Sequence, residues 1–238
     1  MHRIIYFLLF TSLLACTSHD QQNIPPDPDT EGTPPESSAP GFGTSKSRPE
    51  GTSFAFPTGI ILVQKPRTDD ECWSEAKEHK KMKGAGDGVG FCLAFSNSNA
   101  YSVRIELPPG LIWVAERNEV YQDIPQNGII IKMVTVLVPA RSVETIWLHA
   151  YCINVDRSSS RSGDTYEHQP IVSNHPGIKA LAQFLATKKI NEEDFSTEPT
   201  DAERQQLAFV SVAVNDVEKY GKVQPSTQVY LDQLPNVK

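Results

Sequence analysis

The chain has 238 residues, a formal net charge of -7 at pH 7 and four cysteines. Its acidic balance argues against nucleic acid as a partner, because binding to phosphates requires a basic face. The longest apolar run, from Ile4 to Leu14, is too short for a transmembrane helix, which needs about 20 apolar residues. About 185 residues follow position 53, an ordinary size for one domain.

Residues 1–15 have the layout of a secretory signal peptide, with an early positive charge, an apolar core and a small residue before Cys16. The stretch Leu13-Leu14-Ala15-Cys16 resembles the lipobox of bacterial lipoproteins, in which the cysteine is acylated after export. The resemblance implies an exported protein anchored to a bacterial membrane by lipid on Cys16, the outer membrane in a Gram-negative cell. Two or more acyl chains hold a protein stably. A plain secreted protein is the alternative.

Residues 16–53 follow as a lipidated cysteine and a linker rich in Pro, Ser, Thr, Gly and acidic residues. Such a composition buries too little apolar surface to fold, and its prolines keep the chain extended. The sequence therefore predicts a disordered stalk between the membrane and the folded part.

Between residues 54 and 157, short runs rich in Val and Ile alternate with Pro, Gly and Asn, which predicts the strands of an antiparallel β-sandwich. In YSVRIEL, residues 101–107, the four apolar side chains share one face of a strand. The other expected strands are TGIILVQ, GVGFCLAFS, GLIWVAE, GIIIKMVTVLV and ETIWLHAYC.

Residues 158–238 are expected to be helical and to pack on the sandwich. Apolar residues from Ile178 to Leu185 follow helical spacing, and a capping box at Thr200 and Glu203 opens a second helix. Within that second segment, residues 210–214 also alternate like a strand. A further helix is expected from Thr68 to about Met82, with a capping box at Thr68 and Glu71.

Residues 105–157 resemble uncharacterised secreted bacterial domains with an immunoglobulin-like fold. The likeness lies in four short motifs: Pro109-Gly110, Gln126-Asn127-Gly128, Val138-Pro139-Ala140, and Tyr151-Cys152 followed by Asn154 and Arg157. It implies a mainly β protein, an immunoglobulin-like antiparallel β-sandwich with two or three appended helices. It implies no activity.

Besides Cys16, the chain holds Cys72, Cys92 and Cys152. One disulfide and one buried thiol is the economical arrangement in an oxidising compartment. Cys72 with Cys92 is favoured because this pair closes the shortest loop, although sequence alone leaves the connectivity open. Cys152 follows an apolar strand face and is expected to be a packed thiol.

No metal or cofactor site is predicted. His149 and Cys152 lie three apart on an expected strand and point to opposite faces, so they do not converge on a metal with His168 and His175. The glycine-rich segment 84–90 precedes a strand, whereas a phosphate-binding loop follows a strand and opens a helix.

Two groups of residues in the sequence can form contact surfaces. Trp113, with Trp147, His149 and Tyr151 along one strand, can form an aromatic contact surface for proteins or sugars, or can be covered by the C-terminal helices. The basic cluster Lys77 to Lys83 is typical of the solvated side of a short helix, and lipid headgroups are its alternative partner.

The sequence contains no recognised catalytic motif. We therefore expect a non-catalytic binding or assembly role at the cell envelope, with an envelope protein or a glycan as ligand. The alternative is an envelope hydrolase that uses paired carboxylates, with Glu106, Glu116, Glu119 and Asp123 as candidates. A pocket with two facing acids would favour the hydrolase, and a flat aromatic patch would favour binding. A purely structural spacer would show neither.

Overall fold

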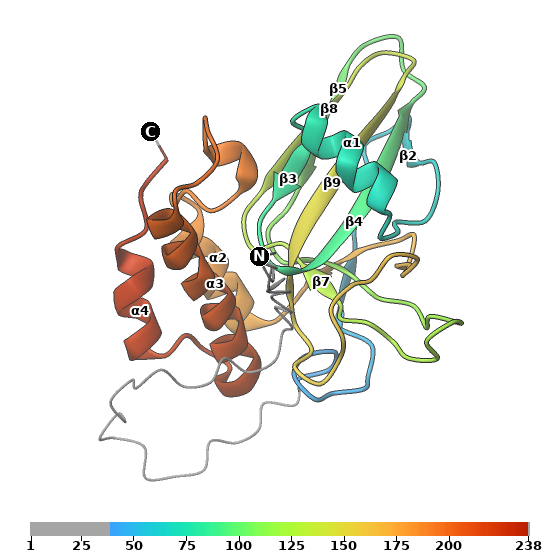
Figure 1. Cartoon of the computed structure of the whole chain (residues 1–238). Coiled ribbons are helices and arrows are strands. Elements are labelled where there is room, and N and C mark those ends of the chain that lie inside the picture. The colour runs from blue at the N-terminus through green and yellow to red at the C-terminus, as the bar shows by residue number, and fades with distance from the viewer. Residues whose placement is uncertain (1–38, 238) are drawn as a thin grey trace, which may run out of the picture.

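The computed structural model describes residues 39–237 and arranges them in three layers (Figure 1). A small sheet and a large sheet enclose one core, and the C-terminal helices cover the other face of the large sheet. The expected signal peptide, Cys16 and most of the expected stalk lie outside the described residues. None of the described helices combines the length and the apolar character that crossing a bilayer requires.

The large sheet is built on the long antiparallel pair of β4 and β9, which runs from Gly88 opposite Tyr151 to Ser96 opposite Val143. Its strands are β1 (Gly51–Ser53), β2 (Ile60–Leu62), β3 (Met82–Gly84), β4 (Gly88–Asn97), β6 (Leu111–Trp113), β7 (Gly128–Ile129), β9 (Val143–Cys152) and β10 (Ile171–Ser173). They follow the order β1-β10-β6-β7-β9-β4-β2 with antiparallel neighbours. β3 differs, because it pairs with β9 in parallel.

The small sheet consists of β5 (Val103–Leu107) and β8 (Val134–Val138), paired antiparallel. Ile105 and Val136 from this sheet share one buried cluster with Phe91 and Ile146 from the large sheet. The described chain is thus mainly antiparallel β-sheet in a sandwich-like arrangement with four α-helices. The alternation expected for residues 103–107 is confirmed, but Tyr101 precedes the strand and is 65% exposed.

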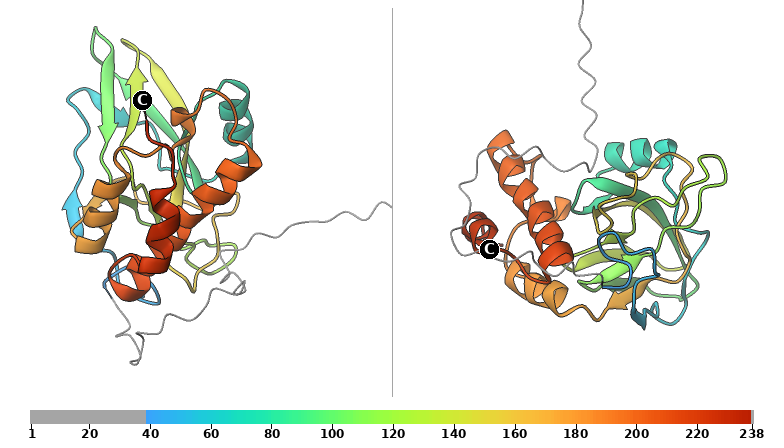
Figure 2. Two further views of the ribbon diagram at one scale, coloured as in Figure 1. Left: turned by 90° about the vertical axis from the view of Figure 1, so that its left-hand side faces the viewer. Right: turned by 90° about the horizontal axis from the view of Figure 1, so that it is seen from below.

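The C-terminal layer contains α2 (Pro176–Leu185), the short 3-10 helix η1 (Glu192–Asp194), α3 (Asp201–Tyr220) and α4 (Pro225–Asp232). Figure 2 shows these helices on one side of the sheets. The buried face of α2 includes Ile178, Leu181 and Leu185, as its spacing predicts. The capping box of Thr200 and Glu203 is also confirmed, so the segment that alternates like a strand is helical.

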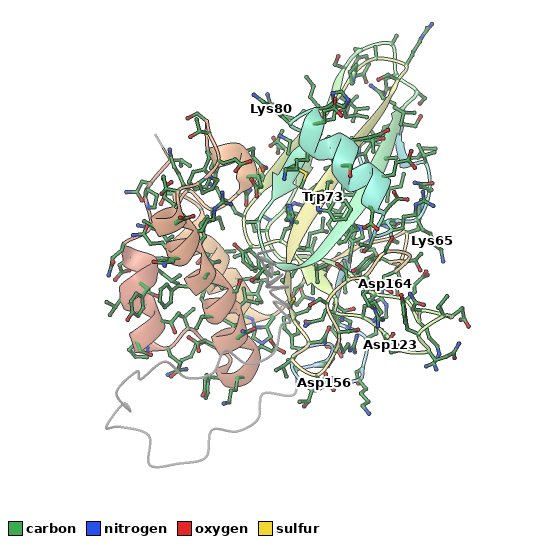
Figure 3. All side chains as sticks on the ribbon, viewed as in Figure 1. Lys65, Trp73, Lys80, Asp123, Asp156 and Asp164 are labelled. Atoms are coloured by element: carbon green, nitrogen blue, oxygen red, sulfur yellow. A yellow bond between two sulfur atoms is a disulfide. The ribbon has the colours of Figure 1, made fainter. Side chains whose placement is uncertain are left out.

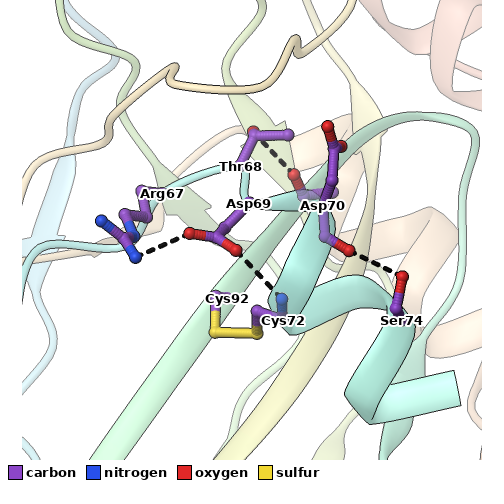
Figure 4. The surroundings of a disulfide bond; sticks show 8 residues. Arg67, Thr68, Asp69, Asp70, Cys72, Ser74 and Cys92 are labelled. Carbon is purple, nitrogen blue, oxygen red and sulfur yellow. Dashed lines mark hydrogen bonds and ion pairs between the residues drawn. A yellow bond between two sulfur atoms is a disulfide. The ribbon is translucent and has the colours of Figure 1, made fainter. Parts of the chain in front are cut away.

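Helix α1 (Asp70–Glu78) begins one position later than the sequence pattern indicates. Its N-cap is Asp69, whose side chain accepts a hydrogen bond from the Cys72 amide at 3.0 Å (Figure 4). Thr68 instead donates its hydroxyl to the Gly90 carbonyl at 2.8 Å, and its amide donates to Asp164 at 2.9 Å. The predicted capping box at Thr68 is therefore wrong, because Thr68 is held against the sheet.

A disulfide between Cys72 and Cys92 joins α1 to β4, which is the pairing that the sequence favours (Figure 4). The two residues are 20 positions apart. Cys152 lies outside any disulfide and is half-buried, with its thiol 3.2 Å from the Asp87 carbonyl oxygen.

The expected stalk boundary at residue 53 is wrong for the part of it that the structure describes. Phe42 is 2% exposed and lies in the cluster between the large sheet and the C-terminal helices. The Gly43 amide donates to the Ile153 carbonyl at 3.0 Å, and β1 pairs with β10. A single phenylalanine and a three-residue strand anchor this segment. Neither could be recognised from the sequence, because the segment as a whole is polar.

The boundary between sandwich and helices at residue 157 also needs correction. β10 lies within the region expected to be helical, yet it pairs with β1 and β6 in the large sheet. The run expected as one strand at residues 128–138 is divided between β7 and β8, in different sheets. β3 and α4 were not anticipated, because a three-residue strand and an eight-residue helix are too short for a clear period.

Candidate functional site

A cavity of about 260 Å³ opens between the sandwich and the C-terminal layer, and we call it the helix-side pocket. Its walls come from the β3–β4 loop, β9, residues 190–199 and α3. The polar lining is Asp87, Tyr151, Glu192, Arg204 and Ser211, and the remaining lining is Ala85, Gly86, Ile190, Phe195, Pro199, Leu207 and Ala208.

Asp87 joins the sheet to α3 at the pocket. Gly86 precedes it with a φ of +123°, a backbone angle that side-chain-bearing residues rarely adopt. This turn brings the Asp87 carboxylate to α3, where the Ser211 hydroxyl donates to it at 2.9 Å. The glycine-rich segment therefore directs an acidic side chain towards the C-terminal layer.

The wall formed by residues 190–195 is fixed by an enclosed ion pair. Lys132 and Asp194 are 2.6 Å apart, with their side chains 11% and 13% exposed. The same Asp194 oxygen accepts from the amides of Ile190 and Asn191, each at 2.9 Å. Glu193 accepts from the Gly84 amide at 2.9 Å and so links this wall to β3. The pocket thus has a wall tied to β3 and to the connection between β7 and β8.

The surroundings of the pocket change the acid–base behaviour of its side chains. Partial burial raises the pKa of Glu192, whose side chain remains exposed, and the nearby Arg204 charge opposes that rise. Burial also raises the pKa of Tyr151, and the negative charges of Asp87 and Asp194 add to the effect. Beside the pocket, burial lowers the pKa of His149 to about 4 although Asp87 opposes this change, so the imidazole is neutral at pH 7.

The lining favours a ligand with hydrogen-bond donors or positive charge next to an apolar part. Glu192 and Asp87, which also accepts from Ser211, contribute carboxylate oxygens to the lining, and Arg204 pairs with Glu198 at 3.3 Å. Phe195 and the aliphatic residues around it supply an apolar wall. Small-molecule sites usually measure about 300–1,000 Å³, so the volume fits one compact group.

The aromatic surface expected from the sequence is not exposed. Trp113 is 0% exposed in the sandwich core, and Tyr151, 3% exposed, packs against the C-terminal helices. Trp147 is 6% exposed and lies over Gly90, where a β-carbon would come within 2.6 Å of its ring. The sequence left two alternatives for these residues, an exposed contact surface or burial under the C-terminal helices. The second applies, and among these residues it applies to Tyr151 alone. His149 lies mostly buried between Trp147 and Tyr151 on the same strand face.

The histidines considered as metal ligands lie in separate surroundings. His175 caps α2, with its Nδ1 accepting from the Ile178 amide at 3.4 Å, and His168 is exposed. Within residues 39–237, no group of three or more His, Cys, Asp or Glu side chains is placed to hold a metal ion.

The four acids considered as catalytic candidates do not line the helix-side pocket. Glu116 is paired with Lys65 at 2.6 Å, and Glu106 and Glu119 are exposed. Asp123 is paired with Arg161 at 2.5 Å, and the hydrogen bond from Arg161 lowers the pKa of that carboxyl. Figure 3 shows Asp123 near Asp164 among the loops, away from the C-terminal helices.

Of the polar residues in the pocket, only Tyr151 was expected from the sequence to belong to a contact surface. The others lie between positions 87 and 211, and no short-range pattern connects them. The one local signal is an acid between glycines in GAGDGVG, a composition that also suits a flexible loop. Comparison with protein-family models, curated proteins and solved structures finds no match to this chain. The chemistry of its own side chains is therefore the basis for inferring its function.

Proposed function

We propose that the protein is an exported, lipid-anchored component of a bacterial cell envelope that binds an envelope ligand without altering it chemically. The helix-side pocket carries this proposal, since it combines polar side chains and an apolar wall in one cavity. Asp87 is not among the groups that shift the pKa of Glu192, so the two carboxylates do not form the closely facing pair that a hydrolase would use. The lipobox resemblance at Cys16 supports the anchor. The Cys72–Cys92 disulfide supports export, because disulfides persist in oxidising compartments.

The ligand within this proposal is a glycan or a segment of an envelope protein. Sugar hydroxyls and peptide amines both donate to carboxylates, and sugar rings and side chains both offer apolar surface to an aromatic wall. We also propose that residues 105–157 belong to an immunoglobulin-like β-sandwich. The antiparallel pairs β4–β9 and β5–β8 around one core are compatible with it.

The surroundings of the two nucleophilic side chains near the pocket favour binding over covalent catalysis. Ser211 donates its hydroxyl to a carboxylate, and Cys152 directs its thiol to a backbone carbonyl. A catalytic cysteine is activated by a neighbouring base or a positive charge, and a catalytic serine by a base stronger than a carboxylate, such as a histidine. His149 is mostly buried, and its pKa of about 4 makes it a weak base at pH 7.

A hydrolase remains the second candidate because Asp87 and Glu192 line the same pocket. Partial burial raises the pKa of Glu192, which suits a general acid, and Asp87 would then serve as the base. These are not the acids that the sequence suggested. This candidate predicts that Glu192→Gln abolishes turnover of a glycan substrate while binding persists, whereas the binding role predicts no product from the parent protein.

Site-specific photo-crosslinking in intact cells tests the binding role. The full chain would carry a photoreactive amino acid at Ala208, which lines the pocket on α3. Ala202 is the matched control, since it is exposed on the same helix outside the pocket. We expect a discrete adduct from position 208 that is absent from position 202 and weakened by Asp87→Asn. Identical adducts at both positions would rule out the pocket as the binding site.

A further inference from the structure

A second cavity, of about 310 Å³, lies where β3 meets the small sheet. We call it the basic pocket; its polar lining is Lys80, Lys81, Lys83, Arg104, Thr135 and Glu144. In Figure 3 Lys80 lies near α1, at the opposite end of the sandwich from Asp123 and Asp156. The basic pocket shares no lining residue with the helix-side pocket.

The fold brings these cations together from two distant parts of the chain. The expectation that Lys77 to Lys83 form one side of a helix is wrong beyond Glu78, where α1 ends. Lys81 immediately precedes β3 and Lys83 lies within it, so their side chains project from the same strand face. Arg104 comes from β5, with its side chain on the exposed face of the small sheet.

The charges around the basic pocket are only partly balanced. Lys81 pairs with Glu144 at 2.9 Å. Lys83 lies near Glu193, where its charge opposes the rise in pKa that burial causes in that carboxyl. Lys80 and Arg104 have no ion pair with any other described residue. Positive charge therefore exceeds negative charge at this cavity, with Lys80 and Arg104 uncompensated, in a chain whose formal net charge is -7.

One further feature of the lining fits an anion. The Thr135 side chain is half-buried and makes no hydrogen bond to another described residue, so its hydroxyl is available to donate. Lys80 is placed at the pocket by the end of α1. It has a φ of +55° because it follows the C-cap His79, and the amides of Lys80 and Lys81 donate to the carbonyls of Lys77 and Ala76.

We propose that the basic pocket binds a phosphate group in its doubly charged form. Two uncompensated cations match the charge of a phosphate monoester, and lysine, arginine and threonine side chains together donate to several of its oxygens. The group can belong to a soluble phosphorylated compound or to a lipid headgroup, since the cavity recognises the phosphate itself. This site is independent of the helix-side pocket and of the ligand proposed there.

The test uses the full chain with Cys16→Ser, so that no acyl chain contributes to vesicle binding. One arm measures binding of inorganic phosphate by calorimetry. The other measures co-sedimentation with phosphatidylcholine vesicles with and without phosphatidic acid, a phosphomonoester lipid. The test variant is Lys80→Gln with Arg104→Gln. The control, Lys179→Gln with Lys222→Gln, removes the same charge from exposed positions outside the basic pocket.

We expect the parent to bind in at least one arm and the test variant to bind about tenfold more weakly or worse, because charge-assisted hydrogen bonds are lost. The control should match the parent. Phosphate binding alone indicates a soluble ligand, whereas binding that requires phosphatidic acid indicates a headgroup. Lys80→Gly, which relieves the backbone angle, should weaken binding without loss of folding. Absence of binding in both arms, or equal losses in the test and control variants, would overturn the site.

Discussion

Glu218 is a buried carboxyl at the junction of three segments. It is 4% exposed on α3, accepts a hydrogen bond from the Val155 amide at 2.9 Å and lies close to the Gly43 amide. Burial raises its pKa to about 7, and these two amides oppose the rise. One side chain thus links the beginning of the described chain, the segment after β9 and the C-terminal layer.

This pKa makes stability depend on pH in a defined direction. Because the folded-state pKa of about 7 exceeds the ordinary 4.5, the folded protein holds this proton more tightly than the unfolded chain does. The stabilisation that this proton gives to the folded protein is complete below about pH 4.5 and is lost as pH rises through 7. The free energy of unfolding of the parent should fall by about 2–3 kcal/mol between pH 5 and pH 8, and Glu218→Gln should remove this fall. Urea unfolding at the two pH values measures it. Equal pH dependence in parent and variant would contradict the assignment.

Lys132 tests whether the wall of the helix-side pocket depends on its ion pair. Lys132→Ala leaves the Asp194 carboxylate enclosed without its cation, so we expect a loss of about 3–5 kcal/mol in the free energy of unfolding. Lys65→Ala is the control, since Lys65 is 55% exposed in its pair with Glu116 and should cost at most about 1 kcal/mol. Similar losses in the two variants would show that enclosure does not set the strength of the Lys132 pair.

At the scale of elements, the disulfide secures α1 to the large sheet. We expect Cys72→Ala with Cys92→Ala to reduce the free energy of unfolding by about 3 kcal/mol, because the unfolded chain regains the freedom of a 20-residue loop. Denaturant unfolding measures this loss, and Cys152→Ala serves as the comparison outside the bridge. A double variant as stable as the parent would show that the bridge does not stabilise the fold.

Elements were predictable from sequence where the pattern was long or the cap chemistry was distinctive. α2 and α3 have an apolar stripe over several turns, and α3 also has a capping box. By contrast, β10 is a strand because it pairs with β1 and β6 in the large sheet, and its own three residues do not predict this. Asp69 is the N-cap of α1 because hydrogen bonds to distant residues hold Thr68 against the sheet. The spacing of residues near Thr68 in the sequence does not show those distant partners.

The candidate site was far less predictable than the fold, because it is assembled between layers. Asp87 reaches Ser211 across 124 positions. The aromatic row was correctly placed on one strand face, but the sequence did not show that the C-terminal helices cover Tyr151 while Trp147 packs over Gly90. Burial by distant elements is a property of the whole fold, and no local pattern in Trp147 or Tyr151 reports it.

At the scale of the whole molecule, the proposed arrangement is a three-layer domain attached to a membrane through Cys16. Cys16→Ser should move the protein from the membrane fraction to the soluble fraction, because acyl chains supply the membrane affinity. Cys152→Ser is the matched control and should remain with the membrane. Fractionation tests this, and a Cys16→Ser protein that stays in the membrane fraction would remove the lipid anchor from the proposal.

Mass spectrometry of the mature N-terminus tests the lipid-anchored identity most directly. The expected result is an N-terminal peptide that begins at Cys16 and carries the mass of a diacylglyceryl group on its sulfur. An unmodified peptide that begins at any other residue would contradict the account.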